Sequence, residues 1–600
     1  MLGANMRAHC AQNLGTEYAN SLPLLGEAMA DILTLFGCKT VFGVGGDFAD
    51  NIISAFEGKL ETAPSSNEMH AGYAACAQAQ ISGLGATLTT FTVGSLPCSS
   101  PAALAVAEKL PVVFISGAPG EQEISDTLLH HSVASSSEWM MKYDCALKSF
   151  RALGMRAERL QGARSKGQPN MAAERFFQLV AHAYANKQPV FIEIPRDLVF
   201  EPTQALKLPQ TPGDVNHETY VLDGAQHIAE HIVEKLNQSS HPLLFVGENV
   251  KLNTRLCEQL RNFVNKFNIP YATSWLAKGV LDESDPLSVG SYNGVFSPDY
   301  VRYYIEQKVD YILEVDTSIQ SQDTNNAFCS GTHVIQSFEN KTMVKGTVQN
   351  QQGLLHVFEQ LLVSDIPVFQ TLLEEKRRPV LDDNDSVDFH NLADALNDVQ
   401  SQLSASLIYL PEIGNSYFAS YSLETKRSSH CRPWLTNPWY GAMGSSLPYA
   451  RAVAKTLKSS NSSDIAVVIT GDGGFHFQSN ELIHFQREHL AVVILYMRNN
   501  IFHLGKSGES TMYHCSTPGF DVLTLVKAYG GKGLQCRTIG ELRTHLQSAV
   551  ESNCGITLLE IPVDPNSDKL SREISMLNLF IQMKNGKQGA KEAWDLAVAG

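Results

Sequence analysis

Asp472 and Asn499 are the two residues of this sequence whose positions point most directly to chemistry, because each follows an apolar run as short as a buried strand. The runs cover residues 465–470 and 491–497. A carboxylate and an amide oxygen, completed by water and diphosphate oxygens, suit Mg²⁺, which prefers hard oxygen ligands. We therefore predict a magnesium and diphosphate site at Asp472 and Asn499.

Glycines surround the aspartate of this site, at Gly471, Gly473 and Gly474. Glycine lets the backbone approach a phosphate closely, and a helix that starts there directs its N-terminus at the same place. Gly-Asp-Gly alone also marks ordinary turns, so a structural turn without metal is the alternative. The position of both motif halves after strands favours the metal site.

The elements that must position these residues form one strand–helix–strand unit. Between the two apolar runs lies a segment with helical spacing, whose apolar positions are Phe477, Leu482, Phe485 and Leu490. This order implies parallel strands in an open α/β sheet. Ligands bind at the carboxyl ends of such strands, which is where both polar residues fall.

The motif resembles the diphosphate and Mg²⁺ motif of thiamine-diphosphate-dependent enzymes, and the chain as a whole resembles the pyruvate decarboxylase and indolepyruvate decarboxylase group. The resemblance extends from about Leu22 to Pro562. It implies a thiamine-diphosphate- and Mg²⁺-dependent lyase that converts a 2-oxo acid into an aldehyde and CO₂. It also implies a homodimer or homotetramer, with each cofactor between the first domain of one subunit and the third domain of its partner.

Four residues correspond to the catalytic groups of that family. Glu68 resembles the glutamate that activates the cofactor, although a first-turn helix acid is the alternative. Asp47 resembles the active-site aspartate of the decarboxylases, and the competing interpretation is a turn aspartate that caps the next helix. His130 and His131 resemble the decarboxylase histidine pair, which could instead be a solvated loop.

Further residues correspond to the cofactor-binding positions. Met443 matches the apolar residue that props the cofactor into its bent shape, with a core methionine as the alternative. The resemblance assigns the metal to Asp472, Asn499 and the Ile501 carbonyl. It assigns the organic cofactor to Gly414, Asn415, Ser416, Gly441, Met443, Gly471, Gly473, Gly474, Asn499 and Ile501.

The sequence departs from the family at a few positions. Gly505 stands where simple decarboxylases carry a glutamate that helps to protonate the product, and Cys76, Ala77 and Gln80 differ from the family's helix. Two alternatives therefore accompany the decarboxylase prediction. One is a carboligase that forms acyloins from the same cofactor-bound intermediate, and the other is a cofactor-binding homologue without turnover.

Composition excludes several other classes of protein. The formal net charge is −16 without a basic cluster, which argues against nucleic-acid binding. The apolar runs are shorter than the roughly 18 residues of a membrane span. The 11 cysteines are scattered without a C-x-x-C pair, as in cytosolic proteins with reduced thiols. We expect a cytoplasmic enzyme acting on a small molecule, with neither nucleic acid nor membrane as a partner.

The chain of 600 residues is too long for one core. Alternating helical and strand patterns predict three doubly wound parallel-sheet α/β domains. We expect a pyrimidine-binding domain at 21–200, a central domain at 215–365 that the resemblance makes a structural spacer, and a diphosphate- and Mg²⁺-binding domain at 388–565. Residues 1–20 lack an apolar signal-peptide region and are expected to form a loose extension, and 566–600 a tail with a helix near 574–583.

Overall fold

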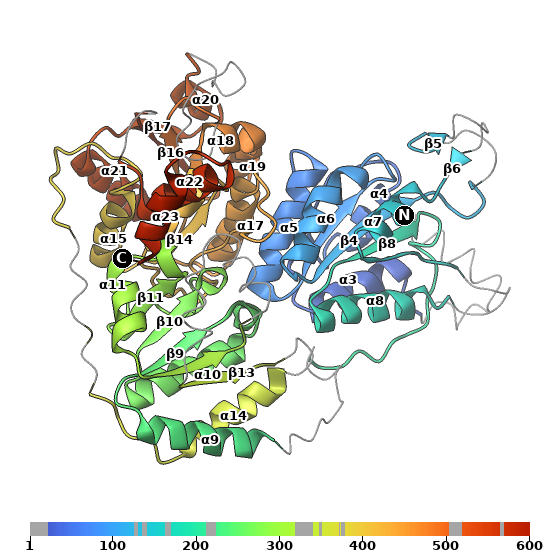
Figure 1. Cartoon of the computed structure of the whole chain (residues 1–600). Coiled ribbons are helices and arrows are strands. Elements are labelled where there is room, and N and C mark those ends of the chain that lie inside the picture. The colour runs from blue at the N-terminus through green and yellow to red at the C-terminus, as the bar shows by residue number, and fades with distance from the viewer. Residues whose placement is uncertain are drawn as a thin grey trace. The chain divides into compact units, whose positions relative to one another are not determined.

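Three parallel β-sheets flanked by helices form most of the computed structural model of the chain, which also has a short antiparallel pair, β5 (Val133–Ala134) and β6 (Met141–Lys142) (Figure 1). The predicted fold class, three doubly wound α/β domains, is therefore confirmed. The structure describes residues 22–124, 130–134, 141–162, 170–211, 224–317, 340–346, 351–370, 373, 379–502, 519–564 and 569–599.

The first sheet has the strand order β2-β1-β3-β4-β8-β7, with all neighbours parallel. Its strands are β1 (Thr40–Gly43), β2 (Glu61–Pro64), β3 (Gly85–Thr89), β4 (Val112–Ala118), β7 (Arg156–Arg159) and β8 (Val190–Pro195). The helices are α3 (Leu25–Leu35), α4 (Asp50–Phe56), α5 (Glu68–Ser82), α6 (Ser99–Ala107), α7 (Cys145–Ala152) and α8 (Ala172–Asn186). Helix α5 packs closely on α6, since a Cβ on Gly72 would lie 2.4 Å from the Pro101 ring.

The second sheet belongs to the central part of the chain and has the order β11-β10-β9-β12-β13. Its strands are β9 (Pro242–Val246), β10 (Tyr271–Ser274), β11 (Ser288–Tyr292), β12 (Tyr311–Val315) and β13 (Lys341–Val344). The helices are α9 (Ala225–Gln238), α10 (Thr254–Phe267), α11 (Asp299–Tyr303) and α14 (Gln351–Val363). Buried apolar residues of α9, α10 and α14 form one core with this sheet.

The third sheet has the order β14-β15-β16-β18-β17. Its strands are β14 (Leu407–Pro411), β15 (Ile465–Gly471), β16 (Val492–Arg498), β17 (Lys532–Gln535) and β18 (Ile556–Pro562). The helices are α15 (Leu392–Gln402), α16 (Asn415–Ala419), α17 (Ser446–Ser459), α18 (Asp472–Gln478), α19 (Leu482–Arg487), α20 (Val522–Ala528) and α21 (Ile539–Ser552). Strands β15 and β16 are buried along nearly their whole length, as their apolar runs predict.

The helix expected between β15 and β16 is interrupted. A 3₁₀ turn at Ser479–Glu481 separates α18 from α19, so the helical spacing does not continue through the segment. Leu482, Phe485 and Leu490 are buried as expected, but the Phe477 side chain is 58% exposed. Phe477, which the helical spacing groups with these three residues, therefore does not share their buried face.

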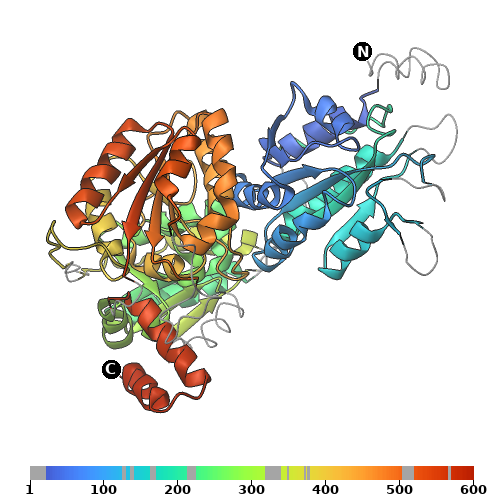
Figure 2. The same ribbon diagram turned by 90° about the horizontal axis from the view of Figure 1, so that it is seen from above.

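Two helices follow the third sheet, α22 (Arg572–Lys584) and α23 (Ala590–Ala599), and they pack on each other (Figure 2). Trp594 of α23 lies against Phe580 of α22 and against Phe296 of the central domain. Helix α22 covers the segment that the sequence analysis expected to be helical.

The described residues form two compact units, divided between Thr219 and Tyr220, with the segment Tyr440–Ala452 belonging to the first. The three sheets lie within the three predicted domain ranges, whose exact boundaries remain predictions, and the expected extension at 1–20 lies outside the described residues. No helix in the described ranges has both the length and the apolar character needed to cross a membrane.

Candidate functional site

Asp472 and the Asn499 turn lie side by side, because β15 and β16 are adjacent and parallel with Gly471 opposite Met497. The Asp472 carboxylate accepts hydrogen bonds from the backbone N–H groups of Asn499 at 3.1 Å and Asn500 at 2.9 Å. Its other oxygen accepts from the Tyr496 hydroxyl at 2.8 Å. The structure thus brings the two predicted metal ligands to one turn.

The electrostatics of this turn suit a cation. Asp472 is 3% exposed, and burial raises the pKa of its carboxyl although the three hydrogen bonds oppose that shift. All three donors are uncharged, so they leave the buried negative charge to be balanced by another group. Asn499 adds an amide oxygen, which accepts from the Ile501 N–H at 3.1 Å. This set of hard oxygen donors fits Mg²⁺.

The glycines at the start of α18 differ in how much space a side chain would find at each position. A Cβ at Gly474 would lie 2.3 Å from the Glu412 side chain, so a larger residue there would displace that glutamate. At Gly471 the nearest atom to a Cβ would be 3.8 Å away, which leaves the backbone open to a ligand. Gly473 is the second residue of α18. The sequence analysis missed Glu412, which is 1% exposed and accepts from Gln478 at 2.5 Å.

The loop at Gly414–Asn415–Ser416 has backbone that a ligand can approach at Gly414. Gly414 has φ +131°, and a Cβ there would meet nothing within 4 Å. The helix α16 begins immediately after it at Asn415, and Ser416 is 3% exposed. Because Gly414 can adopt this conformation without strain, its peptide groups can face a ligand, as the predicted role in binding the pyrimidine ring requires.

Met443 lies in the segment Tyr440–Ala452, two residues after Gly441, which has φ +71°. The Met443 side chain is 41% exposed. A core methionine, the alternative interpretation, is therefore not what the structure contains. An exposed apolar side chain is available to support a bound cofactor, which stays the prediction for this residue.

Glu68 is the first residue of α5, and the Asn67 side chain caps that helix by accepting from the His70 N–H at 2.8 Å. The carboxylate of Glu68 is half-buried and makes no hydrogen bond or ion pair with any described residue. The thiol of Cys98 donates to the backbone carbonyl of Glu68 at 3.2 Å. The glutamate is thus held by its backbone while its carboxylate remains available.

The departures from the family's helix are two fully buried residues of α5 and one half-buried residue, Gln80. Cys76 and Ala77 are fully buried, and the Cys76 thiol donates to the Pro101 carbonyl at 3.5 Å. Gln80 donates to the Tyr449 hydroxyl at 3.4 Å. These residues therefore pack α5 against α6 and against the segment Tyr440–Ala452.

Asp47 and the two histidines form a cluster in the first domain. The Asp47 carboxylate lies 2.8 Å from His130 Nε2 and 3.8 Å from His131 Nε2. It does not cap the next helix, since Ala49 occupies that cap position. The side chains are 43%, 59% and 31% exposed in the order Asp47, His130 and His131. Both histidines thus contact Asp47 while remaining open to solvent, an arrangement suited to moving protons.

Arg196 and Glu123 extend this cluster, and the sequence analysis missed both. Arg196 Nη1 lies 4.0 Å from Asp47, its guanidinium stacks over Phe48, and its Nε donates to Glu123 at 2.9 Å. Hydrogen bonding to Arg196 lowers the pKa of Glu123. Arg196 directly follows β8, so its place at a strand's carboxyl end was the available signal. The positive charge of the Arg196 guanidinium disfavours binding of a metal ion at Asp47.

Gly505, the position of the missing glutamate, lies outside the described residues. Its predicted consequence for the product therefore remains a prediction.

Comparison with known proteins agrees with the geometry in all three domains. Residues 24–138 match the thiamine pyrophosphate enzyme N-terminal TPP binding domain, residues 229–362 match the central domain, and residues 412–561 match the C-terminal TPP binding domain. The two predicted halves of the cofactor site, at Glu68 and at Asp472, fall within the two TPP binding domains.

Similar full-length proteins cover nearly the same span. A Schizosaccharomyces pombe protein named probable pyruvate decarboxylase is 24% identical over 602 residues, covering 95% of this chain and 97% of that protein. The alpha-keto-acid decarboxylase of Mycobacterium ulcerans is 23% identical, covering 92% of this chain and 96% of its own length. With both TPP binding domains and the central domain in order, the chain belongs to the thiamine pyrophosphate enzyme family.

Proposed function

We propose that the protein catalyses the thiamine-diphosphate- and Mg²⁺-dependent, non-oxidative decarboxylation of a 2-oxo acid to an aldehyde and CO₂. The observation that carries the proposal is the pairing of Asp47 with His130 at 2.8 Å and with His131 at 3.8 Å, in a chain that also has the buried Asp472 turn. The names of the similar proteins, pyruvate decarboxylase and alpha-keto-acid decarboxylase, support the same reaction.

The third domain would hold the charged end of the cofactor. Asp472, Asn499 and the Ile501 carbonyl would bind Mg²⁺, and the backbone at Gly471–Gly474 would approach the diphosphate. The backbone of Gly414–Ser416 would meet the pyrimidine ring, and Met443 would support the bent cofactor. When bound, thiamine diphosphate supplies both the carbon nucleophile and the electron sink that decarboxylation needs.

The first domain would handle protons. The carboxylate of Glu68 would exchange a proton with the pyrimidine ring, a role that suits a carboxylate with no partner among the described residues. Asp47, His130 and His131 would act later, on substrate and product, because histidine can donate and accept protons near neutral pH. Asp47 would orient the His130 ring through their hydrogen bond.

One assay tests the proposal. The protein is incubated with Mg²⁺, thiamine diphosphate and a panel of 2-oxo acids, and CO₂, aldehyde and acyloin are measured. We expect CO₂ with equimolar aldehyde, and none from the Asp472→Ala control. CO₂ with acyloin as the main product would support the carboligase instead. Cofactor binding without CO₂ from any substrate would overturn the proposal in favour of a non-catalytic homologue.

The product ratio also tests the Gly505 departure. A missing proton donor would give an acceptor aldehyde more time to react, so added acceptor should raise the share of acyloin. Gly505→Glu should move the product back towards aldehyde. Aldehyde alone, even with excess acceptor, would contradict this effect of Gly505 and leave the simple decarboxylase in place.

We further propose a homo-oligomer in which each cofactor site combines Glu68 of one subunit with Asp472 of its partner. A mixture of inactive Glu68→Gln and inactive Asp472→Ala chains should then recover activity, because some sites would pair two intact domains. Exchange of subunits is verified by native mass spectrometry. If subunits exchange and the mixture stays inactive, the shared site is refuted.

A further inference from the structure

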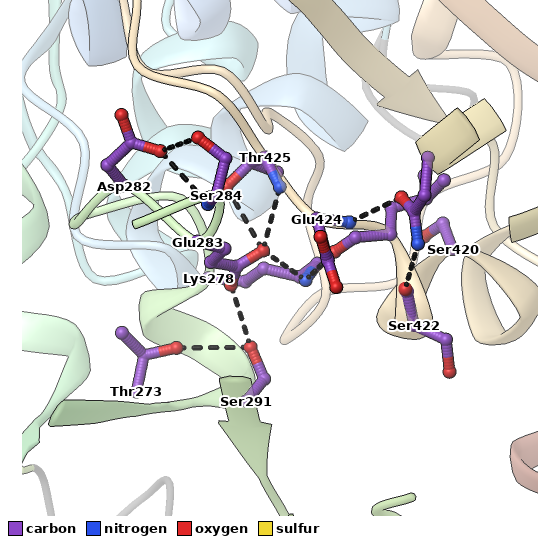
Figure 3. A network of polar contacts seen from close by, with 12 residues as sticks. Thr273, Lys278, Asp282, Glu283, Ser284, Ser291, Ser420, Ser422, Glu424 and Thr425 are labelled. Atoms are coloured by element: carbon purple, nitrogen blue, oxygen red, sulfur yellow. Dashed lines mark hydrogen bonds and ion pairs between the residues drawn. The ribbon is translucent and has the colours of Figure 1, made fainter. Parts of the chain in front are cut away.

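A buried ion pair in the central domain joins Lys278 and Glu283, which are 1% and 2% exposed. Lys278 Nζ lies 2.6 Å from Glu283 Oε2 (Figure 3). A buried ion pair is weak evidence for stability, because the cost of desolvating both charges can exceed their attraction. The contacts of the pair therefore indicate its role better than its energy does.

Those contacts reach residues beyond the central domain. Lys278 Nζ donates to the Leu423 carbonyl at 2.7 Å. Glu283 Oε2 accepts from the Thr425 backbone N–H at 3.1 Å and from its hydroxyl at 3.0 Å, and the Glu283 N–H donates to the Thr425 carbonyl at 2.8 Å. Two charged side chains thus hold the backbone of 423–425, which follows α16 and the Gly414–Ser416 loop.

The central sheet anchors the pair from behind. The second oxygen of Glu283 accepts from the Ser291 hydroxyl at 3.1 Å, and Ser291 lies 3.1 Å from the Thr273 hydroxyl (Figure 3). Ser291 belongs to β11 and Thr273 to β10. The pair is therefore fixed to a rigid sheet and can transmit that rigidity to 423–425.

A continuous set of hydrogen bonds connects 423–425 to Gly414. The Leu423 N–H donates to the Ser420 carbonyl at 3.2 Å, the Ser420 hydroxyl donates to the Tyr417 carbonyl at 2.7 Å, and the Tyr417 N–H donates to the Gly414 carbonyl at 3.1 Å. The stretch from Gly414 to Leu423 consists of α16 followed by a 3₁₀ turn. Displacement at one end would therefore move the other.

Trp275 of the central domain makes a second contact with the same stretch. Its ring stacks on Tyr421 with centroids 3.6 Å apart and planes 14° from parallel. The Tyr421 hydroxyl in turn bonds to that of Tyr417, in α16. The central domain thus holds this stretch at an aromatic contact as well as at the ion pair.

Residues of the third domain and its C-terminal helices hold the opposite side. The Asn397 side chain donates to the Ser422 carbonyl at 3.0 Å and accepts from the Glu424 N–H at 2.7 Å. The Ser422 hydroxyl donates to Glu573 of α22 at 2.8 Å. The stretch 420–425 is therefore held from two sides, and the Lys278–Glu283 pair provides the contacts on the side of the central domain.

We propose that Lys278 and Glu283 are positioning residues of the cofactor site, which fix the Gly414–Ser416 backbone against the pyrimidine ring by holding 423–425. The central domain is then a brace for the cofactor rather than the spacer that the family resemblance implies. This inference rests on the proposed function, because it takes Gly414–Ser416 as the pyrimidine-binding loop. A loop that binds through backbone alone depends on its exact placement, and a 1 Å error can cost about 100-fold in rate.

The test compares two lysines of the central domain. Lys278→Met keeps the side-chain stem and removes the charge. Lys341→Met is the matched control, because Lys341 pairs with buried Glu314 at 3.1 Å and does so within the central sheet. We expect both variants to unfold at lower temperature. Only Lys278→Met should raise the Kd for thiamine diphosphate in Mg²⁺, by about 10- to 100-fold, as for other residues that orient ligand-binding groups.

Hydrogen exchange in the cofactor-free protein provides a readout independent of activity. Amides of 414–425 should exchange faster in Lys278→Met than in wild type, and at the wild-type rate in Lys341→Met. Thr425→Val, which removes one hydroxyl and keeps the volume, covers the case that Lys278→Met does not fold; it should show a smaller change in the same direction.

The outcomes separate the two proposals. Unchanged exchange of 414–425 and unchanged cofactor affinity in the folded variants would overturn the positioning role while the function stands. Equal loss of affinity in Lys278→Met and Lys341→Met would also overturn it, since stability alone would explain the loss. A wild-type protein that binds no thiamine diphosphate in Mg²⁺ would overturn the proposed function itself.

Discussion

The two acidic centres of the protein, Asp472 in the third domain and Asp47 in the first, are built in opposite ways. Asp472 is 3% exposed and its carboxylate accepts from two backbone N–H groups and a tyrosine hydroxyl. The Asp47 side chain is 43% exposed and contacts the side chains of His130, His131 and Arg196. Backbone groups and a buried hydroxyl hold Asp472 in the interior, whereas charged and aromatic side chains surround Asp47 at the surface.

This difference matches the tasks proposed for the two centres. A metal and diphosphate site needs fixed oxygens, and backbone at the ends of two buried strands fixes them before any ligand arrives. Proton transfer needs side chains that can change protonation state and adjust as the substrate changes. We therefore expect substitutions at Asp472 to act on cofactor binding and substitutions around Asp47 to act on turnover.

Asp472→Ala should have the largest effect, a complete loss of cofactor binding, because Asn499 can hold the diphosphate only through the metal. Wild type with ligand at 100 times its Kd should gain about 2.7 kcal/mol of stability, and the variant none. The measurement is thermal unfolding with Mg²⁺ and thiamine diphosphate.

Asp472→Asn serves as the matched control, since it keeps an acceptor for the Asn499 and Asn500 N–H groups but loses the charge. It should fold like wild type and still bind poorly. Tight binding of the cofactor by Asp472→Ala in EDTA would contradict the assignment.

Glu68→Gln should separate binding from chemistry. The amide keeps the size of the side chain but cannot relay the proton, so cofactor affinity should change little while the rate falls by about 10²–10⁴. Proton exchange at the reactive cofactor carbon, followed by NMR in deuterated buffer, measures the step directly. An exchange rate equal to that of wild type would remove Glu68 from its proposed role.

The strands around Asp472 were predictable because the apolar runs in the sequence coincide with the buried strands of the fold. The predicted runs at 465–470 and 491–497 became β15 and β16 to within a residue or two, and a parallel sheet necessarily brings their carboxyl ends together. Phe477 lies outside the buried face because a 3₁₀ turn breaks the helix, and a periodic pattern does not reveal such a break.

Contacts between side chains distant in sequence were not predictable in this way. Arg196 reaches Asp47 and Glu123 pairs with Arg196, each from a separate element, and the spacing of residues along the chain does not indicate which charges will meet. The same holds for the bonds of Lys278 to Leu423 and of Glu283 to Thr425, which depend on how the central and third domains pack. The family resemblance supplied Asp47 and the histidines, which periodicity alone would have left as turn and loop residues.

Arg196→Met tests whether the side chains around Asp47 act on turnover, as the comparison with Asp472 predicts. It removes the cation beside Asp47, so kcat should fall about tenfold, a part of the ~10²–10⁴ that acid–base catalysis contributes. The free energy of unfolding should change by less than about 1 kcal/mol, as for other partly exposed ion pairs. Arg175→Met is the control, because Arg175 makes a comparable pair with Glu158 in the same domain. Equal kcat values in both variants would show that Arg196 acts only on the fold.

The smallest expected effect concerns Glu193, a buried carboxylate of the first sheet that shows what burial does without backbone donors. Glu193 is fully buried in β8, and among the described residues its Oε2 is paired with Arg159 while its Oε1 has no hydrogen-bond partner. Burial raises its pKa from 4.5 to about 7, with Arg159 opposing the shift. The folded chain therefore holds a proton between these values that the unfolded chain has lost.

Stability from this proton is complete below about pH 4.5 and is lost as the pH rises through about 7, by at most about 3.5 kcal/mol at roughly 1.4 kcal/mol per pKa unit. Glu193→Gln cannot titrate, so its unfolding temperature should fall less than that of wild type between pH 5 and pH 8. Both proteins share all other titrating groups, which cancel in the comparison. Equal falls would mean that Glu193 stays ionised beside Arg159. A single guanidinium would then keep the pKa of a buried carboxyl from rising, whereas the three uncharged donors of Asp472 leave its pKa raised.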